Sequence, residues 1–293
     1  MRIAFFVCGV CCSLLLISFA RIPHAGAAST VPAPATRTNA KDGAAMVWVP
    51  AGTFLMGVSD AEMQAMLAER EDYQGEMFSD ERPQRQVALD GYWIYKNLVT
   101  VAQYRQFCQA TKREMPDQPV WVTDDRPVVN VSWVDAQDYA TWAGAVLPTE
   151  AEWEKAARGT DGRRFPWGDN WSVHKCNNMG SWNPEAHGEN HEHQTTPVGS
   201  YPAGASPYGA LDMAGNVWEW CRDWYAEDYY HHAPRNNPLG PEKGDMRVMR
   251  GGSAGSTSKS CRTTVRLAQV PDDTMRNYGG FRCAVESPRA GDQ

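Results

Sequence analysis

Oxygen-bearing side chains gather in residues 209–224, a stretch that also holds three tryptophans. Asp212 and Glu219 offer carboxylate oxygens, and Gly215 and Asn216 between them favour an irregular turn that can aim backbone carbonyls inward. A hard cation such as Ca²⁺ takes several oxygens of this kind, and tryptophans can shield such a turn from water. The alternative interpretation is an aromatic loop packed on a core, with its acids solvated.

Cys261 is a second residue that could do chemistry. Lys259 and Arg262 lie next to it, and such cations lower the pKa of an exposed thiol and make it reactive. A half-cystine or an inert thiol is the alternative. Five cysteines follow residue 12. Because this number is odd, at least one is free or pairs with another molecule, and the spacing does not show which cysteines pair. The five are Cys108, Cys176, Cys221, Cys261 and Cys283.

Three histidines lie close together at His187, His191 and His193. Imidazole is a good ligand for zinc or copper, so the cluster could bind a softer metal than calcium. A solvated surface loop explains the same residues without a ligand.

Residues 1–27 have the features of a secretory signal peptide. Arg2 gives the positive start, residues 3–20 are an uncharged apolar run, and residues 25–27 form a small-residue cleavage site. We therefore expect a periplasmic or secreted protein, not bound to the membrane after cleavage, in a compartment where disulfides form. A retained membrane anchor is the alternative, because the apolar run is nearly long enough to span a bilayer.

The charge of the chain is mildly acidic. Loss of Arg2 and Arg21 with the signal peptide would move the formal charge from −7 to −9. No lysine-rich run or basic patch is visible in the sequence, so nucleic acid is not an expected partner. About 265 residues would remain, enough for one large domain with its own core.

Periodicity predicts regular elements mainly in the first half of the chain. Residues 28–44 are small and proline-containing and predict a disordered lead before a single domain over 45–286, with a tail at 287–293. Strands are expected at 46–57, as a pair around a turn, and at 87–100. Helices are expected at 59–71, after Thr100, after Ser132 and after Thr149, where the last three residues can cap them.

From residue 159 onward helical and strand periodicity almost disappears. Short strand-like pieces remain at 196–200, 247–250, 263–267 and 280–284. An ordered loop region of this length needs something besides regular hydrogen bonding to hold it, such as bound cations, buried tryptophans or a disulfide.

Ordered motifs along most of the chain resemble the formylglycine-generating enzyme family, also called sulfatase-modifying factors. They are WVPAGTFLMG at 48–57, VTVAQY at 99–104, PVVNVSW at 127–133, LPTEAEWE at 147–154, FPWG at 165–168, PV at 197–198, GNVWEW at 215–220, RGGS at 250–253 and GFRC at 280–283. The resemblance implies a single compact α+β domain with little regular secondary structure, a distant variant of the C-type lectin fold.

The resemblance also implies two calcium sites. The first would use the side chains of Asp212 and Glu219 and the carbonyls of Gly215 and Val217. The second, where the match is looser, would use the following residues: Asn177, the carbonyl of Asn178, Asn190 and Glu192.

The chain departs from the family at the copper site. Family enzymes hold Cu(I) between two cysteines that follow Gly-Gly-Ser, but here Ser256 stands at the first position and Cys261 at the second. One thiolate and one hydroxyl are a poor cuprous site, so tight copper binding is not expected. Ser256 and Cys261 remain the candidate catalytic residues. Ala140 and Ala157 also replace frequent family cysteines. The resemblance implies that Arg266, Arg276 and Arg282 line a substrate groove, and the alternative is that they lie on the surface or bind backbone carbonyls.

Three functions follow from the resemblance. The first is an exported, monomeric oxidase or maturation factor that acts on a peptide-like or protein substrate without the complete copper pair, as in the family's periplasmic pyoverdine-maturation branch. The second is a formylglycine-generating, O₂-dependent oxidoreductase that converts a sulfatase cysteine. The third is a non-catalytic lectin-like binding module.

Overall fold

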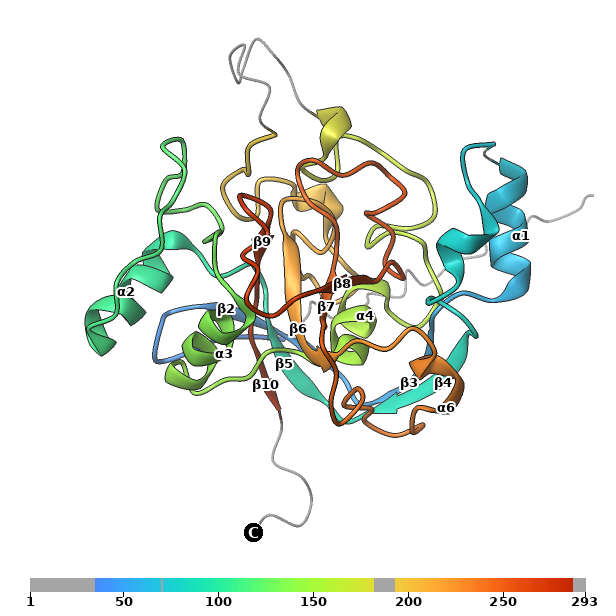
Figure 1. The fold of residues 1–293 in the computed structure, drawn as a ribbon, viewed down its shortest axis with the longest axis horizontal. Coiled ribbons are helices and arrows are strands. Elements are labelled where there is room, and N and C mark those ends of the chain that lie inside the picture. The colour runs from blue at the N-terminus through green and yellow to red at the C-terminus, as the bar shows by residue number, and fades with distance from the viewer. Residues whose placement is uncertain (1–34, 70, 182–192, 287–293) are drawn as a thin grey trace, which may run out of the picture. The chain divides into compact units, whose positions relative to one another are not determined.

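A computed structural model describes residues 35–69, 71–181 and 193–286 (Figure 1). The helices of this part are α1 (Asp60–Glu69), α2 (Val101–Thr111), α3 (Trp133–Trp142), α4 (Glu150–Arg158) and α6 (Tyr229–His232), with 3-10 turns η1 (Gly75–Phe78), η2 (Met179–Ser181) and η3 (Pro202–Gly204). The strands are β1 (Thr36–Thr38), β2 (Ala45–Val49), β3 (Gly52–Met56), β4 (Arg85–Leu89), β5 (Tyr92–Tyr95), β6 (Trp218–Trp224), β7 (Arg247–Arg250), β8 (Leu267–Gln269), β9 (Gly279–Gly280) and β10 (Ala284–Glu286).

The described strands form three small sheets. Their orders are β1-β2-β5-β10, β3-β4 and β8-β7-β6-β9. β10, near the end of the chain, pairs antiparallel with β5, and β9 pairs parallel with β6. The late segments of the chain are thus tied to the early ones by strand pairing, which confirms the prediction of an α+β domain with little regular secondary structure.

The helix caps expected from the sequence are present. The side chains of Thr100, Ser132 and Thr149 each accept a hydrogen bond from the backbone N–H three residues later. The side chains of Gln103, Asp135 and Glu152 bond back to the cap, which completes three capping boxes. Local sequence therefore fixes where α2, α3 and α4 begin.

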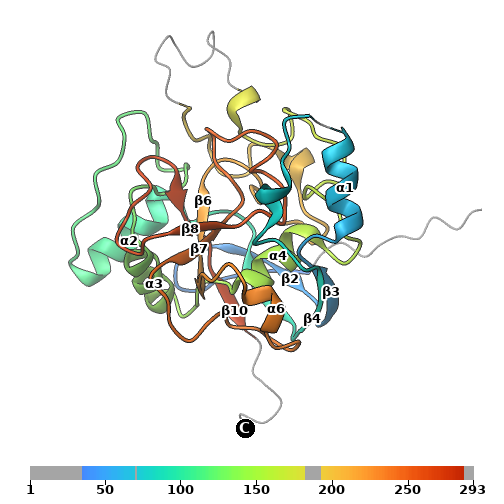
Figure 2. The ribbon, with the colours of Figure 1, turned by 45° about the vertical axis from the view of Figure 1, so that its right-hand side comes forward.

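Helix α4 lies at the centre of the domain, in contact with β3, β4, β6 and β7 (Figures 1 and 2). All nine of its residues are buried, including Trp153. Its charged side chains reach buried partners: Arg250 binds Glu150 and Glu154, at 3.3 and 2.5 Å, and Arg266 binds Glu150 at 2.7 Å. Buried charges need such partners, because an isolated buried charge is very costly.

Several expectations about local structure were wrong. The two strands expected to pair with each other at 46–57 lie in different sheets, because β2 pairs with β1 and β5 whereas β3 pairs with β4. Residues 36–44, assigned to a disordered lead, belong to the domain: β1 pairs with β2, and the buried Asp42 accepts hydrogen bonds from the hydroxyls of Tyr95 and Tyr139 at 2.8 and 2.6 Å. These tertiary bonds order a segment whose composition alone favours disorder. The single strand expected at 87–100 is two strands, β4 and β5, separated at Asp90 and Gly91.

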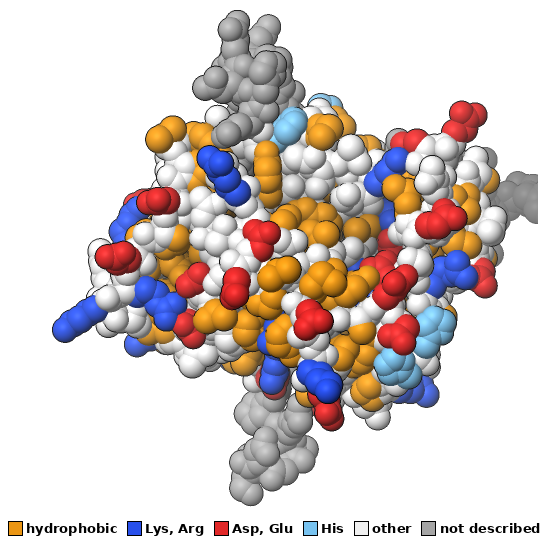
Figure 3. Space-filling view, viewed as in Figure 1, with side chains coloured by type: hydrophobic (Ala, Val, Ile, Leu, Met, Phe, Trp, Pro, Cys, Tyr) orange, Lys and Arg blue, Asp and Glu red, His pale blue; other side chains and the backbone are white. Residues whose placement is uncertain are grey.

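The short strand pieces of the second half are only partly present. Residues 247–250 are β7, but 196–200 are not a strand, and the others are displaced by a few residues to β8, β9 and β10. Among the described residues no helix is long and apolar enough to cross a membrane. On the face drawn in Figure 3, lysine and arginine side chains are scattered among acids.

Candidate functional site

Three segments that the sequence singles out meet in the structure. We call this meeting of residues 176–181, 212–219 and 250–262 the three-loop junction. Backbone hydrogen bonds hold it together: Gly215 N–H donates to the Gly251 carbonyl at 2.8 Å, and Ala254 N–H to the Asn216 carbonyl at 3.0 Å. Asn216 N–H in turn donates to the Asn177 carbonyl at 2.9 Å. Segments far apart in sequence therefore form one local unit.

Gly215 is required at this junction for two reasons. Its φ is +75°, in the left-handed region, and a Cβ there would lie only 2.0 Å from the Asn177 carbonyl oxygen. Any larger residue would push the 176–181 segment away from the turn. The glycine of the GNVWEW motif therefore serves the close approach of two backbones.

Asp212 is buried at the start of the turn. One of its carboxylate oxygens accepts a hydrogen bond from Gly199 N–H at 2.7 Å. Burial raises the pKa of this carboxyl, opposed by the Gly199 amide, the charge of Arg282 and the Asn216 side chain. Within the described residues, the Oδ1 atom of Asn97 is buried and has no hydrogen-bond partner. A Cβ on Gly199 would lie 3.4 Å from that oxygen, so Asn97 lies close to the loop that binds Asp212.

Glu219 is also buried, but its charge is already compensated. Arg282 donates to both of its carboxylate oxygens, at 2.6 and 2.9 Å. Burial raises the pKa of the Glu219 carboxyl, and the Arg282 charge opposes this. The same guanidinium also donates to the carbonyls of Tyr95, Lys96 and Leu211.

The first calcium set therefore fits a cation in part. The buried Asp212 carboxylate and the orphaned Asn97 oxygen suit a hard cation, whereas Glu219 could bind one only while shared with Arg282. Arg282 itself lies at this ion pair and not in an open groove.

The second calcium set is only partly described. The carbonyl of Asn178 accepts from both the N–H and the hydroxyl of Ser181, at 3.0 and 2.8 Å. The Asn177 amide donates to Asn216 and to the Gln194 carbonyl. Four residues of the predicted metal clusters lie outside the described residues: His187, Asn190, His191 and Glu192. Within the described ranges, no group of three or more His, Cys, Asp or Glu side chains could hold a metal ion.

Ser256 and Cys261, the two candidate catalytic residues, have different surroundings. The Ser256 hydroxyl accepts from Ser253 N–H at 2.9 Å and lies 3.3 Å from the Ser253 hydroxyl. Cys261 is fully buried, in a cluster with Cys176 and Ala214. Both cysteines are free thiols in this structure. The fold therefore places a thiol from a distant segment, that of Cys176, near Cys261, although Ser256 stands at the family's first cysteine position.

Cys261 is buried, so it is not the exposed thiol whose pKa neighbouring cations would lower. The hydrogen bond with Cys176 and burial raise the pKa of the Cys261 thiol well above its ordinary value, opposed by the backbone N–H of Gly215. The two cations next to it in sequence point elsewhere. Lys259 forms an ion pair with Asp72 at 3.0 Å, and Arg262 forms one with Glu81 at 2.7 Å.

A groove runs beside the cysteine-bearing loop. Two cavities, of about 280 and 340 Å³, share the wall residues Met66, Arg164 and Asp169. We call them together the α1 groove, since Met66 lies in α1. Ser258, Arg262 and Thr264 from the region of Cys261 line it as well. Sequence reasoning missed this groove because its walls come from separate segments and form no motif.

The groove walls carry charges of both signs. Of the wall residues, Arg164 pairs with Glu69, and Asp161 pairs at 2.6 Å with Arg163 outside the walls, so the walls are polar and carry both signs of charge. Trp171 lines the groove on one side and packs against the Cys176 and Cys261 cluster on the other. The side chain of Trp171 thus borders both the groove and the cluster of the two thiols.

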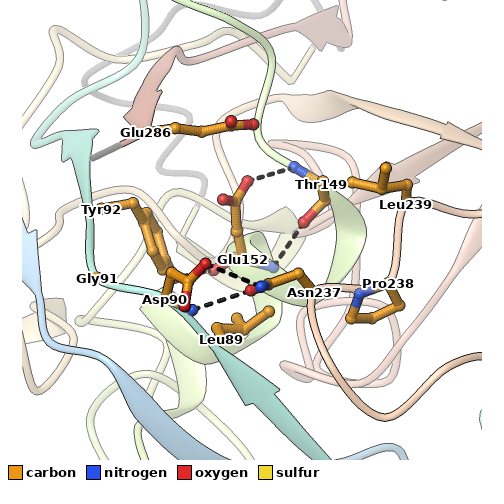
Figure 4. A pocket seen from close by; sticks show the side chains of 10 residues that line it. All are labelled: Leu89, Asp90, Gly91, Tyr92, Thr149, Glu152, Asn237, Pro238, Leu239 and Glu286. Atoms are coloured by element: carbon orange, nitrogen blue, oxygen red, sulfur yellow. Dashed lines mark hydrogen bonds between the residues drawn. The ribbon is translucent and has the colours of Figure 1, made fainter. Parts of the chain in front are cut away.

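A third cavity lies elsewhere and is small, about 30 Å³ (Figure 4). Its walls include the carboxyl groups of Asp90, Glu152 and Glu286, and Asn237 donates to Asp90 at 2.9 Å. Burial raises the pKa of Glu152 to about 7, opposed by the Thr149 backbone amide. This volume holds a few water molecules at most, so we do not assign it a substrate.

Comparison with known proteins gives consistent matches. The family model for the "Sulfatase-modifying factor enzyme 1-like domain" matches residues 31–287. A formylglycine-generating enzyme from Thermomonospora curvata is 35% identical in an alignment of 297 positions that covers 82% of this chain and 93% of that protein. An "Inactive C-alpha-formylglycine-generating enzyme 2" from Mus musculus is 39% identical over 170 residues, covering 56% of this chain and 50% of that protein.

A solved structure has the same fold. PvdO from Pseudomonas aeruginosa superimposes with a TM-score of 0.70 at 26% identity, covering 87% of this chain and 99% of that one. The expectation of a formylglycine-generating-enzyme-like domain is thereby confirmed.

Proposed function

Because the chain belongs to the sulfatase-modifying factor family, we propose that it is an exported oxidase or maturation factor that acts on a peptide-like or protein substrate. The observation that carries this proposal is the α1 groove beside the loop of Ser256 and Cys261. Its size lies in the range of ligand pockets, and its mixed charges suit the polar backbone and side chains of a peptide.

The proposed reaction does not depend on a complete copper pair. Ser256 supplies a hydroxyl where the family has a cysteine, and that hydroxyl is engaged with Ser253. A hydroxyl is a poor ligand for Cu(I). The second thiol near Cys261 belongs to Cys176. Both cysteines are buried in the cluster against which Trp171 packs.

The proposal includes a calcium ion in the three-loop junction. Asp212 would hold it, with the carbonyls of Gly215 and Val217 and the orphaned Asn97 oxygen as further candidates. Such an ion would tie together loops that have few strand hydrogen bonds, and would have a structural role. Glu219 would contribute only in addition to its bond with Arg282.

A non-catalytic binding module is the second candidate. The relative named as inactive, and the absence of a cysteine at position 256, favour it. Both candidate proteins would bind a peptide in the α1 groove, but only the maturation factor would modify it.

The test is a peptide assay with purified protein. A cysteine-containing peptide is added in air-saturated buffer, and O₂ uptake, peptide mass and binding-induced tryptophan fluorescence are followed. We expect binding that is lost in Met66→Trp, which fills the groove, and kept in the control Met246→Trp, at an exposed position. Modification of the peptide supports the maturation factor, and binding without modification supports the binding module. If the peptide is neither bound nor modified, the proposed peptide site in this groove is refuted.

A further inference from the structure

We propose that Cys176 and Cys261 form a disulfide bond that joins the 176–181 segment to the 250–262 loop. The inference rests on the export assumed in the proposed function, because disulfides persist in oxidising compartments. Such a bond would also leave Cys261 without a free thiol for catalysis or metal binding.

The first argument is the contact itself. The two cysteines are 85 positions apart in sequence, yet the fold brings their side chains, both free thiols in this structure, into the same small buried cluster. They share one buried cluster with Ala214, against which Trp167 and Trp171 pack. Two thiols in one small buried cluster are candidates for a disulfide, whose S–S bond is about 2 Å long.

The second argument is that both sulfurs are held in place. The Asn178 amide donates to Cys176 Sγ at 3.5 Å, and Gly215 N–H interacts with Cys261. Gly252 makes room for the latter, because a Cβ on it would lie 3.1 Å from Cys261 Sγ. The neighbouring backbone is therefore fitted around the pair.

The third argument is that the other described cysteines face different groups. Cys108 Sγ faces the Glu114 carbonyl at 3.6 Å, and Cys221 Sγ faces the Glu219 carbonyl at 3.9 Å. Cys283 packs in a hydrophobic cluster of different members, which also includes Cys108. Among the five described cysteines, Cys176 and Cys261 are thus the two that we expect to pair with each other.

The bond forms by exchange with a protein or small-molecule disulfide. The thiolate of one cysteine attacks that disulfide, which gives a mixed disulfide and releases one thiol. The thiolate of the other cysteine then attacks the sulfur of its partner, forming Cys176–Cys261 and releasing the second thiol. The pair loses two electrons and two protons, and the external disulfide is reduced to two thiols.

Burial sets the timing of this exchange. Cys261 has no exposed surface and Cys176 is 2% exposed, so an external disulfide reaches them before the three-loop junction closes. The finished bond is then protected from reductants. A disulfide that closes so long a loop also limits the freedom of the unfolded chain.

The test maps each cysteine separately in the protein purified after export. The protein is unfolded in an alkylating agent without reductant, digested and analysed by mass spectrometry. We expect a Cys176–Cys261 cross-linked peptide and alkylated Cys108, Cys221 and Cys283. In Cys176→Ala, Cys261 should become alkylated, and in the control Cys108→Ala the cross-link should remain. Refolding of reduced protein with oxidised glutathione should give the same cross-link, which tests the pairing apart from export.

Thermal unfolding gives a second readout. Protein that is reduced in denaturant and refolded under reducing conditions should have a Tm about 5–15 °C below that of the oxidised protein, and the same treatment should leave the Tm of Cys176→Ala unchanged. Three results would each overturn the proposed disulfide. They are alkylation of both Cys176 and Cys261 after glutathione refolding, a cross-link between other cysteines, and a stoichiometric metal bound by both thiols. None of these outcomes decides whether the protein modifies a peptide, since the peptide assay measures that independently.

Discussion

Arg282 binds both carboxylate oxygens of Glu219, at 2.6 and 2.9 Å, where neither side chain is exposed to solvent. The same guanidinium donates to three backbone carbonyls from the β5 region and the turn before β6. One cation thus links the GFRC and GNVWEW motifs. The pair neutralises Glu219 and fixes the end of the turn that carries Asp212.

Loss of this cation should strongly destabilise the domain. Arg282→Met would leave the Glu219 carboxylate buried without its partner, and the expected cost is about 3–5 kcal/mol of unfolding free energy. Urea denaturation measures the difference. The control Arg105→Met removes an exposed ion pair with Asp124 and should cost less than about 1 kcal/mol. Equal effects of the two variants would contradict the role of the buried pair.

Calcium should stabilise the protein through Asp212. A cation that binds the folded protein alone adds about 2.7 kcal/mol at a concentration 100 times its Kd, which is roughly 5–10 °C in Tm for a domain of this size. We expect a chelator to remove this gain and Asp212→Asn to abolish it, whereas Asp124→Asn, at an exposed position, should keep it. Calorimetry with and without Ca²⁺ makes the comparison, and an unchanged Tm in wild-type protein would exclude the proposed ion.

Glu152 should make stability fall as pH rises towards neutrality. Its pKa is raised from 4.5 to about 7 by burial, so the folded protein prefers the protonated form. This contribution is complete below about pH 4.5 and is lost as pH rises through about 7, a change of about 3 kcal/mol. Glu152→Gln keeps an acceptor for the Thr149 amide and cannot ionise.

The measurement is the unfolding free energy of wild type and Glu152→Gln at pH 5 and pH 8. The variant should gain about 2–3 kcal/mol relative to wild type between these pH values. Glu114→Gln, at an exposed position, serves as the control and should follow the wild type. Parallel pH profiles for Glu152→Gln and wild type would show that this carboxyl titrates normally.

Copper binding should be weak in the wild-type protein. Ser256 replaces one thiol of the family's pair, and the proposed disulfide takes Cys261 out of the set of available ligands. Competition with a Cu(I) chelator under non-reducing conditions should detect no stoichiometric complex. Exported wild-type protein that holds one tightly bound copper would disprove this expectation, and metal analysis of Cys261→Ala would then show whether this thiol is a ligand.

Local sequence determined the elements whose signals are contained in a few neighbouring residues. Thr100, Ser132 and Thr149 cap helices because a side chain and an amide three residues later meet within one turn. Motif order along the chain also predicted the family and the fold class. The turn at 212–219 was recognised as irregular because Gly215 and Asn216 adopt positive φ readily.

Tertiary structure alone decided which distant groups meet. Cys176 and Cys261 are 85 positions apart, and no spacing rule links two such cysteines. Asp42 orders a segment of disorder-prone composition because Tyr95 and Tyr139 reach it from elsewhere in the chain. Arg282 compensates Glu219 in the same way. Sequence encodes contacts within a few residues directly, whereas the partner of a buried thiol or charge depends on how the whole chain excludes water.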